Sequence, residues 1–153
     1  MKHLLILMIL LVSSAGQAVA DDTVDWKKKT LEQWKTQLSA EQVRVCRQSG
    51  TELPGSGKYN PWKEKGVFVC SSCGQLLFKS EDKFDSGTGW PSYTAPLSKK
   101  AVELSSDTTL FMERTEVKCS RCGAHLGHVF DDGPKPTGKR YCINSVCLDF
   151  KKE

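Results

Sequence analysis

Two nearly identical cysteine pairs, Cys70-Ser-Ser-Cys73-Gly and Cys119-Ser-Arg-Cys122-Gly, constrain the fold of this chain more than any other feature. In a C-x-x-C turn two thiolates converge on one point, and two such turns complete a tetrahedral set of four sulfurs. That set is the preferred arrangement for structural zinc. One zinc ion held by all four cysteines would join parts of the chain that are distant in sequence. Four sulfur ligands leave no open position on the metal, so we expect the site to be structural and not catalytic.

Two other interpretations of these pairs stay open at this point, namely two disulfides or two redox-active C-x-x-C motifs. A redox motif usually follows a strand and opens a helix within a βαβ pattern. Neither pair has that context, so the sequence favours a single zinc site.

Three of the seven cysteines, Cys46, Cys142 and Cys147, lie outside these pairs. The segment KRYCINSVCLDF, residues 139–150, alternates like one β-strand, which puts Cys142 and Cys147 on opposite faces. Five residues of strand would also separate them by about 16 Å. A disulfide tolerates at most about 7 Å between Cα atoms. We therefore expect no bond between these two cysteines.

Cys142 is the better candidate for a nucleophile. Lys139 and Arg140 precede it closely, Asn144 shares its face, and a cationic surrounding lowers the pKa of a thiol and raises its thiolate fraction. Cys147 lies between Val146 and Leu148 and is expected to pack as a small hydrophobic side chain. The alternative for Cys142 is the same inert packing.

Residues 1–20 have the pattern of a signal peptide. Lys2 and His3 precede an apolar run over 4–12, and Ala18-Val19-Ala20 matches a small-residue cleavage site. The run is shorter than the roughly 20 residues that span a bilayer, so we expect no stable membrane association; an uncleaved anchor is the alternative. We predict a periplasmic or secreted protein, which fits the cysteine content. The net charge is a modest +4, and the sequence contains no block of like charges, so nucleic acid is not an expected partner.

The remainder of the chain predicts one mainly β domain. Thr30-Leu-Glu-Gln33 and Ser39-Ala-Glu-Gln42 match the capping box and predict two short N-terminal helices. From residue 67 onward the apolar segments are short and bounded by turns, which indicates antiparallel strands. We divide the chain into an N-terminal extension over 21–37 and a domain over 38–153.

Two further motifs carry candidate functional residues. His125 and His128 form an H-x-x-H just after the second cysteine pair. Gly127 disfavours the helix of a metalloprotease motif, so the two imidazoles could instead position and protonate a polar substrate group. Trp90, in DSGTGWPSY, could form one wall of a small apolar pocket. Simple packing is the alternative for all three side chains.

Taken together, these motifs resemble the type B methionine sulfoxide reductase family. The resemblance covers about residues 38–150 and is carried by GTELP, the paired C-x-x-C, FDSGTGWPSY and CGAHLGHVFDDGPKPTGKRYCINS. It implies two antiparallel sheets that form a small β domain, often with structural zinc on the four cysteines. It implies an oxidoreductase that reduces the R-epimer of methionine sulfoxide in proteins or peptides, and so repairs oxidised proteins.

The resemblance also implies roles for single residues. By match to RYCINS, Cys142 would attack the sulfoxide sulfur and end the step as a sulfenic acid. The other implied site residues are Trp90 for the substrate methyl group, Arg140 for the electrostatics of the site, and His125, His128 and Asn144 for binding or protonating the sulfoxide oxygen.

One position departs from the family pattern. Many members carry a resolving cysteine just before G-W-P-S, and here that place is Thr88. Some members use an N-terminal cysteine, so Cys46 is the candidate resolving residue. A thioredoxin-like dithiol would then reduce a Cys46–Cys142 disulfide. The alternatives are direct reduction of the sulfenic acid by an external thiol and, third, resolution by Cys147. We expect a monomer.

A second class of function is a non-enzymatic zinc-binding interaction module of the same fold. Such a module would need the four paired cysteines and the core but not the implied site residues. This chain retains the nucleophile, both histidines, the asparagine and the tryptophan, which favours the enzyme.

Overall fold

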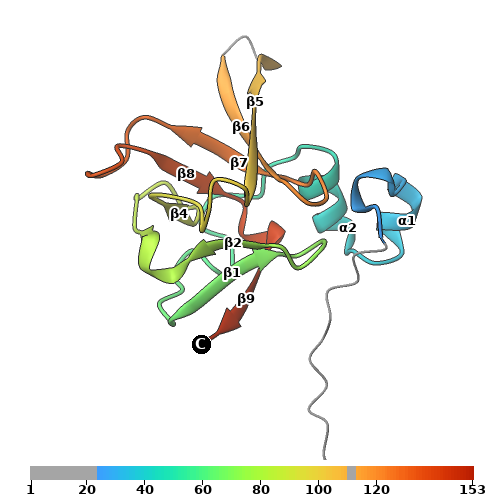
Figure 1. Ribbon diagram of the computed structural model, residues 1–153, viewed down its shortest axis with the longest axis horizontal. Helices are drawn as coiled ribbons and strands as arrows, with labels where there is room; N and C mark the ends of the chain where they lie inside the picture. The colour runs from blue at the N-terminus through green and yellow to red at the C-terminus, as the bar shows by residue number, and fades with distance from the viewer. Residues whose placement is uncertain (1–23, 110–112) are drawn as a thin grey trace, which may run out of the picture.

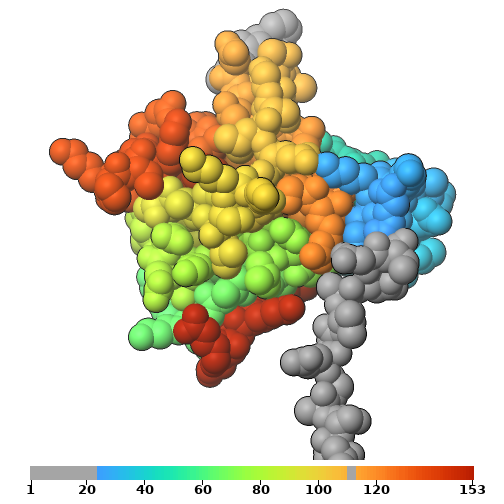
Figure 2. All heavy atoms as spheres, in the orientation of Figure 1, coloured from blue at the N-terminus to red at the C-terminus, as the bar shows by residue number. Residues whose placement is uncertain are grey.

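The structure is a computed structural model that describes residues 24–109 and 113–153, and its strands form two antiparallel sheets (Figure 1). The smaller sheet has the strand order β2-β1-β9, with β1 (Gly66–Cys70), β2 (Leu76–Lys79) and β9 (Leu148–Lys152). The larger sheet has the order β3-β4-β8-β7-β6-β5, with β3 (Lys83–Phe84), β4 (Ser92–Tyr93), β5 (Val102–Asp107), β6 (Arg114–Cys119), β7 (His125–Phe130) and β8 (Arg140–Ile143). The ends of β5 and β6 rise clear of the rest of the molecule (Figure 2). The prediction of a mainly β domain with two antiparallel sheets is confirmed.

Short helical segments precede the sheets and lie together at one side of the molecule (Figure 1). They are η1 (Trp26–Lys28), α1 (Leu31–Lys35), α2 (Ala40–Gln42) and the π-helical turn η2 (Val43–Arg47); η3 (Ser80–Asp82) and η5 (Ser145–Cys147) follow later in the chain. Thr30 and Ser39 both form the predicted capping boxes, because each hydroxyl accepts a bond from the backbone three residues on and the glutamine there reaches back. Within the described residues, no helix has the length and apolar character needed to cross a membrane.

The hydrophobic core lies between the two sheets. Phe68 of β1 and Phe78 of β2 both pack against Tyr93 of β4, with ring centroids 5.3 and 4.4 Å apart. All three side chains are fully buried, as are Leu126 of β7 and Ile143 of β8. Buried aromatic side chains contribute much of the stability of a small domain, so this cluster holds the sheets in the orientation that the site requires.

The prediction of one continuous strand over 139–150 is wrong. The segment begins as β8 in the larger sheet, leaves it at Asn144, makes the single turn η5 and continues as β9 in the smaller sheet. The backbone N–H of Asn144 donates to the Leu126 carbonyl at 2.8 Å, and that of Cys147 donates back to the Asn144 carbonyl at 3.1 Å. The first bond holds Asn144 against β7, and the second closes the turn, so the alternation of side chains does not continue through Cys147.

Because of this bend, Cys147 forms a disulfide with Cys46 of η2. Their Cα atoms are 5.7 Å apart, and both side chains are buried. Cys147 is buried, in agreement with the expected packing as a small hydrophobic side chain, but it is half of a disulfide, which the sequence did not predict. Its predicted separation from Cys142 relied on a regular strand, but the structure agrees that those two are not bonded to each other.

The double variant Cys46→Ser/Cys147→Ser is expected to unfold at lower denaturant concentration than the wild type. The bond joins residues 101 positions apart, and loss of a native disulfide from a small domain costs about 2–5 kcal/mol. The measurement is the free energy of unfolding in urea without reductant. Changing both cysteines together avoids a single buried thiol. A loss below about 0.5 kcal/mol, the usual range for surface changes, would show that the bond does not stabilise the fold.

Candidate active site and metal site

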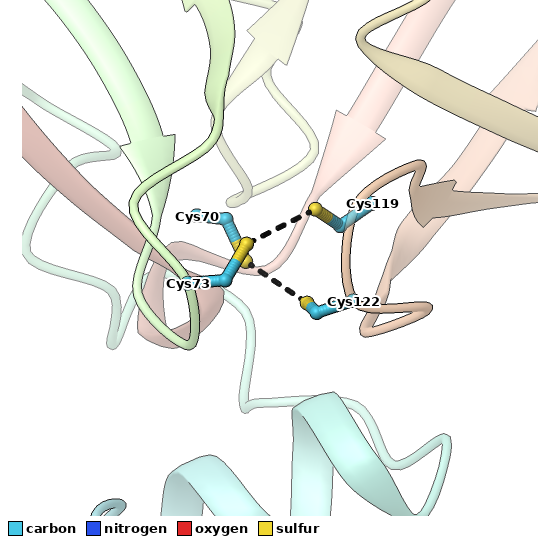
Figure 3. Close-up of side chains that lie close together, drawn as sticks. All are labelled: Cys70, Cys73, Cys119 and Cys122. Atoms are coloured by element: carbon cyan, nitrogen blue, oxygen red, sulfur yellow. Dashed lines mark hydrogen bonds between the residues drawn. The ribbon is translucent and has the colours of Figure 1, made fainter. Parts of the chain in front are cut away.

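The two C-x-x-C turns lie next to each other and bring four sulfurs together, as Figure 3 shows. Cys70 and Cys119 are the last residues of β1 and β6, and Cys73 and Cys122 lie in the turns that follow. All four sulfurs lie within 4.8 Å of one another, and the closest pairs across the turns are 3.6 and 3.7 Å apart. Tetrahedral zinc with sulfurs at about 2.3 Å places them about 3.8 Å apart. The donor set therefore fits a four-sulfur metal site, and the four cysteines form no disulfide.

Both turns use the same backbone construction. Gly74 and Gly123 have positive φ angles of 73° and 69°, and each donates its N–H to the carbonyl of the first cysteine in its turn at 2.8 Å. Glycine adopts this conformation without steric cost. On the outer side Arg47 donates to the Cys122 carbonyl at 3.1 Å and lies 3.7 Å from its sulfur. This cation would offset part of the negative charge of four thiolates.

A second site lies in a cavity of about 140 Å³ in the larger sheet. Its lining residues are Thr51, Trp90, Arg114, Gly127, His128, Phe130, Cys142 and Asn144. Four of the predicted site residues therefore meet there: the thiol, the tryptophan, the asparagine and one histidine. A larger cavity of about 430 Å³ lies beside α2 and η5, but none of its lining residues is a cysteine or a histidine. We place the chemistry in the smaller one.

Cys142 occupies the middle of β8, paired with Ser92 of β4 on one side and His128 of β7 on the other. Burial raises the pKa of its thiol, and the Thr88 hydroxyl and the charge of Arg140 oppose that shift only in part. The sequence-based expectation of a lowered pKa is therefore wrong in sign, although Arg140 acts in the expected direction. Desolvation of the thiolate outweighs one nearby cation.

Each histidine is held by a carboxylate from a neighbouring strand. The Nδ1 of His125 lies 2.7 Å from Glu116, and the Nε2 of His128 lies 2.7 Å from Asp107. Burial lowers the pKa of His125, against the opposing effect of Glu116, so His125 is neutral at neutral pH. It is also buried behind His128, with ring centroids 5.5 Å apart. His128 lines the cavity and His125 does not.

Arg140 also lies outside the cavity lining. Its Nε and Nη2 donate to Asp132 at 2.8 and 2.9 Å, and its guanidinium lies 4.4 Å from the centre of the Phe130 ring. Phe130 is part of the cavity wall. Arg140 therefore supports that wall from behind and contributes charge, and it does not line the space that a substrate would fill.

Glu52 connects the remaining parts of the site. Its backbone N–H donates to the Asn144 side chain at 3.1 Å, and its carbonyl accepts from the Trp90 indole at 3.2 Å. Its buried carboxylate accepts the backbone N–H groups of Ser145 and Val146 at 2.6 and 2.9 Å. The Asn144 amide also donates to the Leu126 carbonyl at 3.0 Å. The carboxylate thus fixes residue 52 against η5, which places Trp90 and Asn144 at the cavity.

Glu52→Gln is expected to weaken both the fold and substrate binding. An amide keeps the side-chain volume but has one acceptor oxygen, whereas the N–H groups of Ser145 and Val146 each bind a separate carboxylate oxygen. A hydrogen bond to a charged group is worth about 1.5–3 kcal/mol. We expect a loss of this size in the free energy of unfolding and a raised KM. Glu41→Gln is the matched control, because Glu41 borders the same larger cavity but pairs only with exposed Arg44. Equal effects of the two changes would contradict the role of Glu52.

Sequence reasoning missed four charged groups that surround the predicted residues: Glu52, Asp107, Arg114 and Glu116. Asp107 and Arg114 face each other across β5 and β6 and form an ion pair at 2.8 Å, and Glu116 pairs with His128 in the strand register. Asp107, Arg114 and Glu116 could have been found by aligning the predicted strands in segment 102–119 with the strand HLGHVF and noting which polar residues fall opposite the histidines. For Glu52, the one indication in the sequence was its place in the motif GTELP.

Comparison with known proteins gives a consistent result. The SelR domain family matches residues 38–152. The peptide methionine sulfoxide reductase MsrB of Methanosarcina barkeri (strain Fusaro / DSM 804) is 60% identical over 126 residues, which is 82% of this chain and 89% of the relative. The protein of the same name from Pseudomonas fluorescens (strain Pf0-1) is 60% identical over 123 residues, 80% and 94% of the two chains. A solved structure titled "Crystal Structure of Mis18 'Yippee-like' Domain" covers 59% of this chain and 98% of its own, with a TM-score of 0.47 and 17% identity, too distant to bear on function.

Proposed function

This chain belongs to the SelR domain family, and from that premise we propose that it is a peptide-methionine (R)-S-oxide reductase. It is an oxidoreductase that returns the R-epimer of methionine sulfoxide to methionine. The observation that carries the proposal within the structure is the position of Cys142. It is the one cysteine that lies neither in the four-sulfur site nor in the disulfide, and it lines a cavity together with Trp90 and His128.

In the proposed reaction the Cys142 thiolate attacks the sulfoxide sulfur. The sulfoxide oxygen ends on Cys142 as a sulfenic acid, the substrate sulfur leaves as a thioether, and the substrate is reduced while the cysteine is oxidised. Charge grows on the oxygen during this step, so it needs a proton or a hydrogen-bond donor. We assign that position to His128, which lines the cavity, with Asn144 beside it and neutral His125 behind it. Trp90 supplies the apolar face for the methyl group.

The sulfenic acid must then be reduced by another thiol, and here the disulfide matters. Cys46 is bonded to Cys147 and can resolve the sulfenic acid only after that bond has been reduced. The role of Cys46 therefore stays a prediction, with this added condition. While the disulfide is intact, we propose that an external thiol reduces Cys142, supplied by a thioredoxin-like dithiol protein that delivers both electrons.

Mapping of disulfides after one turnover without reductant tests this step. Protein with an intact Cys46–Cys147 bond should keep that bond and carry a sulfenic acid that a dimedone probe traps on Cys142. Protein reduced beforehand should form a bond between Cys46 and Cys142 if Cys46 resolves. A Cys142 disulfide that lacks Cys46 would rule out Cys46 as the resolving residue.

We propose that one structural zinc ion occupies the four-sulfur site. The support is the donor set of four cysteines and the 3.6 and 3.7 Å sulfur separations, close to those of tetrahedral zinc. The ion would hold the ends of β1 and β6 together and so join the two sheets. It would take no part in the chemistry.

We further propose that residues 1–20 direct the chain to the periplasm or the exterior, and that the mature protein is a monomer. The predicted leader lies outside the described residues, and the extension over 21–37 lies only partly within them. The disulfide supports an oxidising compartment. Cell fractionation with N-terminal sequencing of the recovered protein tests the leader, and an N-terminus at Met1 would contradict it.

The test of the function itself is turnover of the two separate sulfoxide epimers of a blocked methionine, with a dithiol as the reductant. We expect reduction of the R-epimer and no detectable reduction of the S-epimer. The alternative, a non-enzymatic zinc-binding module, predicts reduction of neither.

A further inference from the structure

Three hydroxyl groups form a continuous chain that ends at the Cys142 sulfur. Ser92 Oγ lies 2.8 Å from Ser86 Oγ, and Ser86 Oγ lies 2.8 Å from Thr88 Oγ1. Thr88 Oγ1 lies 4.0 Å from Cys142 Sγ, at the long end of the range for a hydrogen bond to sulfur. Thr88 is also the position where many relatives, by the resemblance above, carry a resolving cysteine. In this chain the place next to the nucleophile therefore holds a hydrogen-bond donor that is not redox-active.

The local backbone brings these hydroxyls together. Gly87 and Gly89 have positive φ angles of 70° and 91° and fold the loop tightly, and the N–H of Gly87 donates to the Asp85 side chain at 2.9 Å. Ser92 is fully buried on β4, directly opposite Cys142 in the register. At the far end of the chain, Ser92 can donate to the Trp90 carbonyl at 3.2 Å.

The number of hydrogens limits this chain to two ordered states, because each hydroxyl has one hydrogen to donate. With Cys142 as a thiol, S–H donates to Thr88, Thr88 to Ser86, Ser86 to Ser92, and Ser92 to the Trp90 carbonyl. With Cys142 as a thiolate, all three hydroxyls rotate, so that Ser92 donates to Ser86, Ser86 to Thr88, and Thr88 to the sulfur. The thiol proton leaves to water in the cavity, and each hydroxyl keeps its own hydrogen.

We propose that Thr88, backed by Ser86 and Ser92, is a catalytic residue that donates its hydroxyl hydrogen bond to the Cys142 thiolate. This inference rests on the proposed function for the identity of the nucleophile. Aligned hydroxyls polarise one another, so the bond at the sulfur is stronger than that of a single hydroxyl. The chain thus stabilises the reactive form of a thiol that burial otherwise keeps protonated.

The charged and titratable groups near Cys142 do not replace this donor. Arg140 on the same strand lowers the pKa of Cys142 by its charge and by a hydrogen bond, each less than Thr88 does, and its Nε and Nη2 are engaged with Asp132. His128 on β7 and Arg114 on β6 both bind Asp107 at the cavity edge. Among the hydroxyls of the described residues, Thr88 lies 4.0 Å from the sulfur and opposes the rise in the pKa of Cys142 most, and Ser92 acts in the same direction more weakly.

The test is the pH dependence of the reaction of Cys142 with a small dithiodipyridine probe, without any sulfoxide. Thr88→Val removes the hydroxyl at nearly constant shape and should raise the measured pKa of Cys142 by about one unit, a roughly tenfold loss of thiolate at neutral pH. A thiolate of higher pKa is about threefold more nucleophilic per unit. We therefore expect Thr88→Val to react about threefold slower near neutral pH and about threefold faster on the alkaline plateau.

This crossing of the two pH profiles is the diagnostic result, because simple damage to the site would slow the reaction at every pH. Thr88→Ser should restore the wild-type profile, and Ser92→Ala should give a smaller shift in the same direction. Thr94→Val is the matched control, since its hydroxyl contacts Asp82 and not Cys142. Identical profiles for Thr88→Val and wild type, or a uniform slowing, would overturn the proposal.

The two proposals can fail separately. A crossing profile in a protein that reduces neither sulfoxide epimer would support the hydroxyl chain and refute the function. Epimer-specific turnover with unshifted profiles would leave the function standing and refute the role of Thr88.

Discussion

Replacing Cys142 with serine should lower kcat/KM for methionine-R-sulfoxide by about a thousandfold or more, because a serine hydroxyl is a far weaker nucleophile than a thiolate unless a base activates it. Among the described residues no such base is in place, since the side chains hydrogen-bonded to the sulfur are two hydroxyls and a guanidinium, and both histidines are engaged with carboxylates. The measurement is steady-state turnover of the R-epimer with excess dithiol.

Two measurements separate loss of chemistry from loss of fold in this variant, and a second variant tests whether the loss is specific to Cys142. The Cys142→Ser protein should keep its metal content and the unfolding midpoint of the wild type, because a hydroxyl fits the space of a thiol in a half-buried position. Cys46→Ser/Cys147→Ser should retain reduction of the first sulfoxide equivalent, because neither residue performs the attack. Wild-type turnover in Cys142→Ser would refute the assignment of the nucleophile.

Cys122→Ser should abolish metal binding and leave the chain unfolded or nearly so. Structural zinc contributes about 10–16 kcal/mol to the folding of small zinc peptides, whereas an ordinary domain is stable by only about 5–15 kcal/mol. The site joins β1 of one sheet to β6 of the other, so its loss affects both sheets. The measurements are zinc per chain by elemental analysis and near-ultraviolet circular dichroism.

Ser72→Ala is the matched control for the metal site. Ser72 lies in the same turn as two of the sulfur ligands, and its buried hydroxyl has no hydrogen-bond partner among the described residues. This variant should keep one zinc per chain and its fold. Wild-type protein that is stable without metal, together with a stable Cys122→Ser variant, would contradict the structural role of the ion.

Much of the fold and of the site follows from short-range patterns. The capping boxes at Thr30 and Ser39 are local, and each depends on residues three positions apart. The four-sulfur site follows from two copies of one turn. The meeting of Cys142, His128, Asn144 and Trp90 follows from the family resemblance, because no spacing in the sequence places residue 90 next to residue 142.

The failures of prediction have a common physical cause, which is contact over long sequence separation. Alternation along 139–150 predicts one strand, but the Glu52 carboxylate binds the backbone of Ser145 and Val146 from more than 90 positions away and stabilises a turn there. The same bend lets Cys147 meet Cys46. The sequence predicts the shift in the pKa of Cys142 with the wrong sign, because the neighbouring residues reveal the nearby cation but not the burial of the thiol.

Because a buried disulfide joins η2 to η5, the redox conditions during production decide whether a sample contains the disulfide form or the dithiol form of the protein. Chains that fold in an oxidising compartment contain the disulfide, whereas chains produced in a reducing cytosol contain two additional free thiols instead. Under the proposed resolving role of Cys46, the two thiols of the second form supply one additional electron pair for turnover, and the first form lacks that pair. Burst amplitudes measured on the two forms should therefore differ although their sequences are identical.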